Sequence, residues 1–117
     1  MLENRDYCDY DTCVTLKELG FNALVDWYFN EDKRIVSSLA TYRDTYIPRI
    51  SLYEAQKWLR EEKQVEVIVL SRGMIGAPYY FQVYTEDYVI ADDKDYASFE
   101  EALSEGIKET VEILKEE

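Results

Sequence analysis

Residues 65–84, VEVIVLSRGMIGAPYYFQVY, decide the fold class of this chain. Two runs of β-branched and aromatic residues, 65–70 and 79–84, flank SRGMIGAP, whose two glycines and proline are typical of a turn. Such runs favour strands, and the short connection between them favours direct pairing. The stretch therefore predicts an antiparallel β-hairpin.

The second strand of this hairpin has two chemically different faces. Because side chains alternate along a strand, Phe81 and Val83 point one way, whereas Tyr80 and Tyr84 point the other. We expect Phe81 and Val83 to face helices, and the two tyrosines to lie on the opposite, more exposed side.

A capping box predicts the start of a helix on each side of the hairpin. In SLYEAQKWLREEK, Ser51 can accept a hydrogen bond from the amide of Glu54 while the Glu54 carboxylate reaches back. Ser98 and Glu101 repeat this pattern in SFEEALSEGIKETVEILKEE. Apolar residues then follow one helical stripe in each segment: Leu52, Ala55, Trp58 and Leu59 in the first, and Phe99, Ala102, Leu103, Ile107, Thr110, Val111 and Leu114 in the second.

The N-terminal half predicts the same kinds of element. A shorter helix should run from about Asp11 to Leu19, with Gly20 as its C-terminal stop. The runs ALVDWYF (23–29) and RIVSSLA (34–40) flank the polar stretch NEDK and predict an earlier hairpin.

These elements follow the order helix, hairpin, helix, hairpin, helix. That order predicts an α+β fold in which the helices pack on one face of a mainly antiparallel sheet. The chain has 117 residues, of which 47% are hydrophobic, so it can supply one core. We therefore expect residues 1–117 to form a single domain.

The charge of the chain limits the partners that it can have. It carries 25 acidic and 13 basic residues, for a net charge of −12, which disfavours direct binding to nucleic acid. No run of residues is long and apolar enough for a membrane span, and the sequence MLENRDYCDYD lacks the pattern of a signal peptide. We therefore expect a cytoplasmic protein that does not bind membranes.

Acidic residues concentrate towards the C-terminus. Residues 71–117 hold 12 acids and only 4 bases, and Glu105, Glu109 and Glu112 lie opposite the apolar stripe of the last predicted helix. Two interpretations stay open: a solvated face that confers solubility, or a docking surface for a protein with a basic surface.

Tyrosine is unusually frequent, with 11 residues, and it is common both in strands and in recognition surfaces. Tyr80, Tyr84 and Tyr88 are therefore candidate contacts with a protein partner. Met74 and Ile75 would lie at the tip of the hairpin turn, where exposed apolar side chains could contact a partner or a second copy.

Catalytic and metal-binding motifs are scarce in this sequence. The chain has no histidine and no glycine-rich phosphate loop, so we expect neither an enzyme nor a bound cofactor. Cys8 and Cys13 are interpreted as reduced structural thiols, because zinc would need further ligands. The acidic stretch TEDYVIADDKDY lacks the glycine and the spacing of an EF-hand loop, so we expect a solvated connector instead.

The helical motifs LYEAQKWLRE and SFEEALSEGIKE, with YYFQVY between them, resemble a family of small uncharacterised proteins found in gut Bacteroidales and in their phages and prophages. The resemblance covers about residues 48–114. It implies a small, host-directed interaction protein, and it implies no activity, cofactor or catalytic residue.

Four hypotheses for function follow. The first is a non-enzymatic acidic protein-binding module, encoded by a phage or mobile element, that uses the tyrosine-bearing strand and the acidic C-terminal region. The second is a nucleic-acid mimic that occupies the basic groove of a host protein. The third is a small carboxylate-dependent hydrolase, which would need two acids with opposed pKa shifts in one pocket. The fourth is self-association through Met74 and Ile75.

Overall fold

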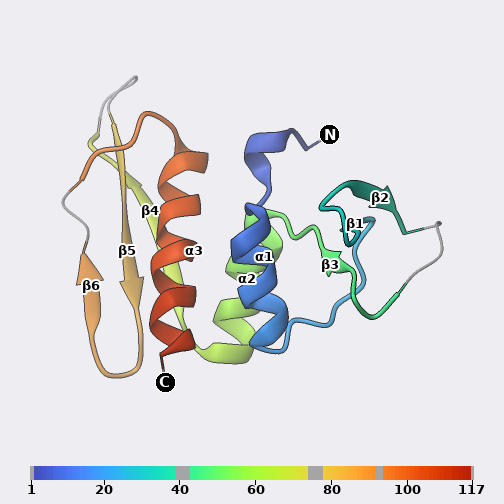
Figure 1. Cartoon of the computed structure of the whole chain (residues 1–117). Helices are drawn as coiled ribbons and strands as arrows, with labels where there is room; N and C mark the ends of the chain where they lie inside the picture. The colour runs from blue at the N-terminus through green and yellow to red at the C-terminus, as the bar shows by residue number, and fades with distance from the viewer. Residues whose placement is uncertain (1, 39–42, 74–77, 92–93, 117) are drawn as a thin grey trace.

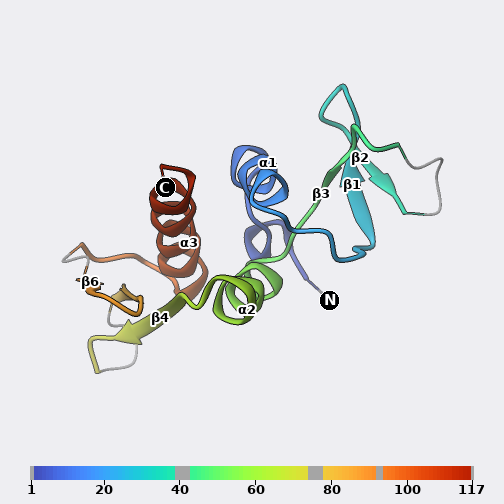
Figure 2. The same ribbon diagram turned by 90° about the horizontal axis from the view of Figure 1, so that it is seen from below.

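In the described residues the protein has an α+β fold, in which three α-helices lie between two antiparallel sheets of three strands each (Figure 1). This is a computed structural model, and it describes residues 2–38, 43–73, 78–91 and 94–116. The same side-by-side arrangement of sheet, helices and sheet is visible after a quarter turn (Figure 2).

The three α-helices are α1 (Tyr10–Glu18), α2 (Leu52–Lys63) and α3 (Phe99–Lys115). A short 3-10 helix, Asn4–Asp6, precedes α1. The three α-helices run in the same direction, with their N-terminal ends at the top of Figure 1. Helix α3 contacts both α1 and α2. None of the helices in the described part of the chain is long and apolar enough to cross a membrane.

Side-chain caps explain where the helices begin. The predicted capping box of α2 is present, because Ser51 accepts from the Glu54 amide at 3.0 Å and the Glu54 carboxylate accepts from the Ser51 amide. Ser98 likewise accepts from the amide of Glu101, but the Glu101 carboxylate accepts from Ala97, one residue before the cap. In α3, therefore, only the Ser98 half of the predicted capping box is present.

The predicted second hairpin is confirmed. Strands β4 (Glu66–Ser71) and β5 (Tyr79–Tyr84) pair antiparallel, and a third strand, β6 (Val89–Ala91), pairs with the other edge of β5. Helix α3 packs on one face of this sheet, where Phe81 and Val83 are buried as predicted. Strand β6 lies in the acidic stretch that was interpreted as a solvated connector, so that interpretation is corrected for these three residues.

The predicted first hairpin also forms, with shorter strands. Strands β1 (Trp27–Phe29) and β2 (Ile35–Ser37) pair antiparallel, and β3 (Ile47–Pro48) pairs with the free edge of β1. This sheet contacts α1 through β3, on the side of the helices away from β4–β6. The described part of the chain therefore has two sheets where one was expected, because the three α-helices separate the two hairpins.

One contiguous cluster of buried apolar side chains includes residues from all three helices and both sheets. Its fully buried members include Leu16, Ile50, Leu59, Val67 and Ile107. Burial of such side chains stabilises a fold by about 1.5–3 kcal/mol each. The cluster therefore joins the helices and both sheets through one shared core.

Candidate protein-binding surfaces

The face of sheet β4–β6 that points away from α3 is one candidate surface, which we call the outer face. The strand register assigns Tyr80 and Tyr84 to this face, as predicted, since their neighbours Phe81 and Val83 point into the core. In the described part of the chain, most side chains that the register assigns to the outer face are apolar or aromatic: Ile68, Leu70, Tyr80, Tyr84, Val89 and Ala91. Glu66 and Gln82 are its polar members, and Glu66 is ion-paired with Arg60.

Two contacts hold the tyrosines in place on the outer face. The Arg72 guanidinium lies 4.1 Å from the centre of the Tyr80 ring and forms a 2.8 Å ion pair with Asp95. The Tyr84 hydroxyl donates a hydrogen bond to Gln82. Tyr84 is 36% exposed and Val89 is 54% exposed, so the face offers apolar area to a partner.

The acidic residues of α3 form a separate surface. Glu105, Glu109 and Glu112 are all exposed on α3, which packs on the inner face of the sheet. The structure therefore does not bring them together with Tyr80 and Tyr84, and the two halves of the predicted site lie on different sides of the molecule.

A groove of about 530 Å³ runs between α1 and α3. It is lined by acidic and basic side chains together: Asp9, Asp11, Glu18 and Glu112, with Lys108 and Lys115. Two charged contacts cross or border the groove, since Lys108 lies 3.2 Å from Asp9 and 3.5 Å from Glu105. The groove is therefore acidic overall but is not a continuous row of carboxylates.

The ion pair between Asp9 and Lys108 changes the pKa of both groups. Partial burial raises the pKa of Asp9, but hydrogen bonds from Thr12 and Lys108 outweigh this effect and hold the pKa below its usual value. Partial burial lowers the pKa of Lys108, and the Asp9 carboxylate more than compensates, so its pKa is raised. Both groups are therefore more firmly ionised in the folded protein.

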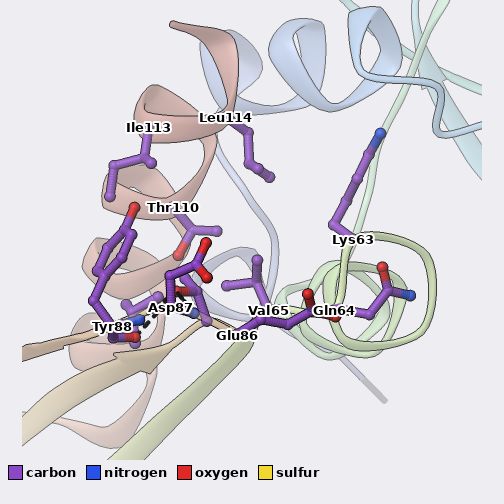
Figure 3. A pocket seen from close by; sticks show the side chains of 11 residues that line it. Lys63, Gln64, Val65, Glu86, Asp87, Tyr88, Thr110, Ile113 and Leu114 are labelled. Carbon is purple, nitrogen blue, oxygen red and sulfur yellow. Dashed lines mark hydrogen bonds between the residues drawn. The ribbon is translucent and has the colours of Figure 1, made fainter. Parts of the chain in front are cut away.

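Tyr88 belongs to a different site from Tyr80 and Tyr84. It lies in the turn between β5 and β6, beside a pocket of about 220 Å³ (Figure 3). This turn pocket has a floor of Val65, Val83, Ile113 and Leu114, and a rim that includes Glu86, Asp87 and Tyr88. No motif in the sequence predicted it, because its walls come from three segments that are far apart in the chain.

Several other sequence-based expectations concern this region or its neighbours. Met74 and Ile75 lie outside the described residues, as do Asp92 and Asp93 of the acidic stretch.

A surface that the sequence did not suggest surrounds Leu24, which is 91% exposed at the edge of a depression of about 720 Å³. Leu24 belongs to the run 23–29, which predicts a strand, and the pattern of that run does not indicate that the Leu24 side chain is exposed.

Two properties of the acidic and cysteine side chains bear on the hydrolase and metal-site hypotheses. Across residues 2–38, 43–73, 78–91 and 94–116, no three Cys, Asp or Glu side chains come together to hold a metal ion. Hydrogen bonds from the Glu3 amide lower the pKa of Asp6, and backbone and Thr45 donors lower that of Glu31. The pKa of Asp9 is also lowered, so the shifts of Asp6, Asp9 and Glu31 have the same direction, whereas the hydrolase hypothesis calls for two acids with opposed shifts in one pocket.

Cys8 and Cys13 are both free and buried. The Cys8 thiol is hydrogen-bonded to Cys13 and is buried, and both effects raise its pKa well above the usual value for cysteine. Cys13 Sγ lies 3.5 Å from the Ile50 amide, which donates to it. This arrangement is that of packed structural thiols.

No protein-family model, curated protein or solved structure matches this chain.

Proposed function

We propose that this protein is a non-enzymatic binding module that docks on a protein partner through the outer face of β4–β6. The observation that carries the proposal is the asymmetry of this sheet. Helix α3 covers one face, whereas the other presents Leu70, Tyr80, Tyr84 and Val89 without a covering element among the described residues. Aromatic residues on a flat, partly apolar surface are typical of the centre of a protein interface.

The charge of the molecule supports a partner with a basic surface. The net charge of the protein is −12. The acids Glu105, Glu109 and Glu112 lie on α3, which packs on the opposite face of the sheet, so a partner bound to the outer face would not contact them directly. Charges outside an interface act mainly on the rate of association, because they steer the approach of an oppositely charged partner. We therefore assign contact to the sheet face and steering to the acidic helix.

The setting that we propose is the bacterial cytoplasm, where the protein would act on a host protein. The resemblance of the two helical motifs to proteins of gut Bacteroidales and their phages supports this setting.

The experiment uses three forms of the immobilised protein to retain host proteins, which mass spectrometry identifies. The forms are the unchanged protein, an outer-face variant with Tyr84→Ser and Val89→Ser, and an acidic-helix variant with Glu105→Gln, Glu109→Gln and Glu112→Gln. All five side chains are exposed, so each variant should fold.

We expect a basic protein that the unchanged form retains and the outer-face variant loses. For the purified pair, the acidic-helix variant should slow association with little change in dissociation, and added salt should reduce the difference. Retention by the outer-face variant with unchanged affinity would contradict the proposal.

The second candidate is a nucleic-acid mimic, and the groove between the parallel helices α1 and α3 is the observation that favours it. Carboxylates from both helices line this groove, but Lys108 and Lys115 interrupt them. A mimic should lose its partner with the acidic-helix variant and keep it with the outer-face variant, which is the opposite of the result expected above.

A further inference from the structure

The turn pocket lies where the C-terminal ends of α2 and α3 meet the turn between β5 and β6 (Figure 3). Thr85 fixes the shape of this turn. Its hydroxyl accepts from the amides of Asp87 and Tyr88 at 3.2 and 3.0 Å, and its own amide donates to the Tyr88 carbonyl at 2.9 Å. The acidic rim is therefore held at a fixed place beside the apolar floor.

The pocket has the size and lining for one long side chain. Its volume of about 220 Å³ is below the roughly 300–1,000 Å³ of pockets that take drug-sized ligands. Val65 and Val83 are buried in its floor, and Ile113 and Leu114 are partly buried. An occupant with an apolar stem would bury that stem against these side chains.

The electrostatics of the rim favour a cationic end group. Glu86 and Asp87 are exposed, and neither carboxylate has an ion-pair partner among the described residues. Helices α2 and α3 both end here, which adds the negative ends of two helix dipoles. Tyr88 supplies an aromatic ring on the same side as Ile113, against which a cation can stack.

Lys63 is the basic side chain that lines the pocket, and it does not neutralise the rim. Its ammonium lies 5.6 Å from the centre of the Trp58 ring on its own helix. Figure 3 shows its side chain extending away from Asp87 and Tyr88. Two carboxylates and an aromatic ring are thus left to act on an incoming group.

We infer that the turn pocket binds the side chain of an arginine on the partner protein. An arginine combines an apolar stem with a planar cation that carries five donors, and this cation can both stack on Tyr88 and pair with the Asp87 carboxylate. The inference rests on the proposed function, because it names one residue of the basic partner that this function requires.

The test uses N-acetyl-arginine amide as a probe, with N-acetyl-citrulline amide as its neutral counterpart and N-acetyl-lysine amide as a second cation. Backbone amide shifts in ¹H–¹⁵N NMR spectra report binding and confirm folding in each sample. We expect the arginine probe to shift the amides of Gln64, Val65 and Thr85–Tyr88 with saturation in the millimolar range, the lysine probe to bind more weakly, and the citrulline probe to have little effect.

A variant with Glu86→Gln and Asp87→Asn should bind the arginine probe at least about tenfold more weakly, because it removes the Asp87 carboxylate that pairs with the guanidinium and the second negative charge of the rim. The control variant carries Glu61→Gln and Glu62→Gln, two exposed acids at the same end of α2 that do not line the pocket. This control has the same net charge and should bind as the unchanged protein does.

Three results would overturn the inference: no saturable shift with the arginine probe, equal shifts with the citrulline probe, or equal weakening in the control variant. The titration needs no partner and no outer face, so its failure is separate from a failure of the proposed function. If the probe binds but the outer-face variant keeps its partner, the proposed function fails and the pocket stands.

Discussion

Asp9 connects two helices through its two carboxylate oxygens. One oxygen accepts from the Thr12 amide at 2.8 Å and caps α1, and the other lies 3.2 Å from the Lys108 ammonium on α3. The sequence pattern predicts a start of α1 near Asp11, two residues after Asp9, and predicts no role for Asp9. The cap could have been found from the residue type, because Asp is a preferred N-cap, but the ion pair depends on a contact between distant segments.

The two roles of Asp9 can be separated by substitution. Asp9→Ala removes the cap and the charge and should lower the free energy of unfolding by about 0.5–2 kcal/mol at neutral pH. Asp9→Asn keeps a good cap and removes only the charge, so it should cost less, since the ion pair is largely exposed. Urea denaturation at pH 7 measures both, and an equal loss in the two variants would show that the cap contributes little.

The pH dependence of stability follows from the same group. Because the pKa of Asp9 is lower in the folded state, its contribution is complete above the unfolded pKa of about 4 and is lost as the pH falls through the folded pKa. The pKa of Lys108 is raised, so its contribution is complete below about pH 10 and is lost only above that. As the pH is lowered below about 4, the free energy of unfolding should therefore decrease less steeply for Asp9→Asn than for the unchanged protein.

The two cysteines illustrate what residue type alone can predict. They were interpreted as structural thiols, and both are buried. Their exact role depends on position: Cys8 precedes the Asp9 cap and Cys13 is the fourth residue of α1, which are the two positions of a hydrophobic staple. That role could be recognised only once the cap was known.

At the scale of elements, the packing of α3 on the sheet depends on Gly106. A β-carbon at this position would lie 2.6 Å from Val67 Cγ1 and 3.2 Å from two ring carbons of Phe81. The missing side chain lets the helix approach β4 and β5 closely. A glycine inside a helix lowers helix stability by about 1 kcal/mol relative to alanine. The close approach of α3 to the sheet explains why a glycine is nevertheless present at position 106.

Gly106→Ala should therefore destabilise the protein although alanine favours helices. Overpacking of a core costs about 1–3 kcal/mol, which exceeds or equals the gain in helix propensity. We expect a net loss in the free energy of unfolding, measured by urea denaturation. Val67→Ala alone also destabilises the core, but in that background the additional loss caused by Gly106→Ala should be smaller, because the shortened side chain makes room for the new β-carbon. Glu109→Ala, at an exposed position of the same helix, is the control and should change stability by less than about 0.5 kcal/mol. A more stable Gly106→Ala variant would show that Val67 and Phe81 can move aside.

The elements differ in how far the sequence could predict them. Helices α2 and α3 have capping residues and long apolar stripes, and the β4–β5 hairpin has six residues in each strand, most of them β-branched or aromatic, so local patterns were sufficient. Strands β3 and β6 have only two and three residues, which is too short for a period to be visible. They are strands because the free edges of β1 and β5 are available to pair with them.

At the scale of the whole molecule, the parallel helices explain why the predicted site is divided. Helix α3 lies with its apolar side on one face of β4–β6, so its acidic side necessarily faces away from the sheet. Tyr84 and Glu105 lie only 21 positions apart in the sequence, so both are predicted to contact the same partner. They are separated in space because α3 packs on one face of β4–β6, whereas Tyr84 lies on the opposite face of the same sheet.

The same layered arrangement predicts unequal stability across the molecule. Strands β1–β3 are two or three residues long and contact the helices through β3 and α1, whereas β4 and β5 are six residues long and are covered by α3. Segments with few buried contacts and short ladders open locally without unfolding the whole protein. Amide hydrogen exchange in β1 and β2 should therefore be at least about tenfold faster than in β4 and β5.

Mass spectrometry of peptides from exchanged protein can measure this difference, with the peptide of α3 as an internal reference for global unfolding. Gly106→Ala sharpens the test, because it should speed exchange in β4 and β5 more than in β1 and β2 if the two sheets open separately. Equal exchange rates in both sheets, and an equal response to Gly106→Ala, would mean that the common apolar cluster joins them in one cooperative unit. In that case a partner bound on the outer face would stabilise the distant β1–β3 sheet as strongly as its own, whereas separate opening confines this stabilisation to β4–β6 and the helices.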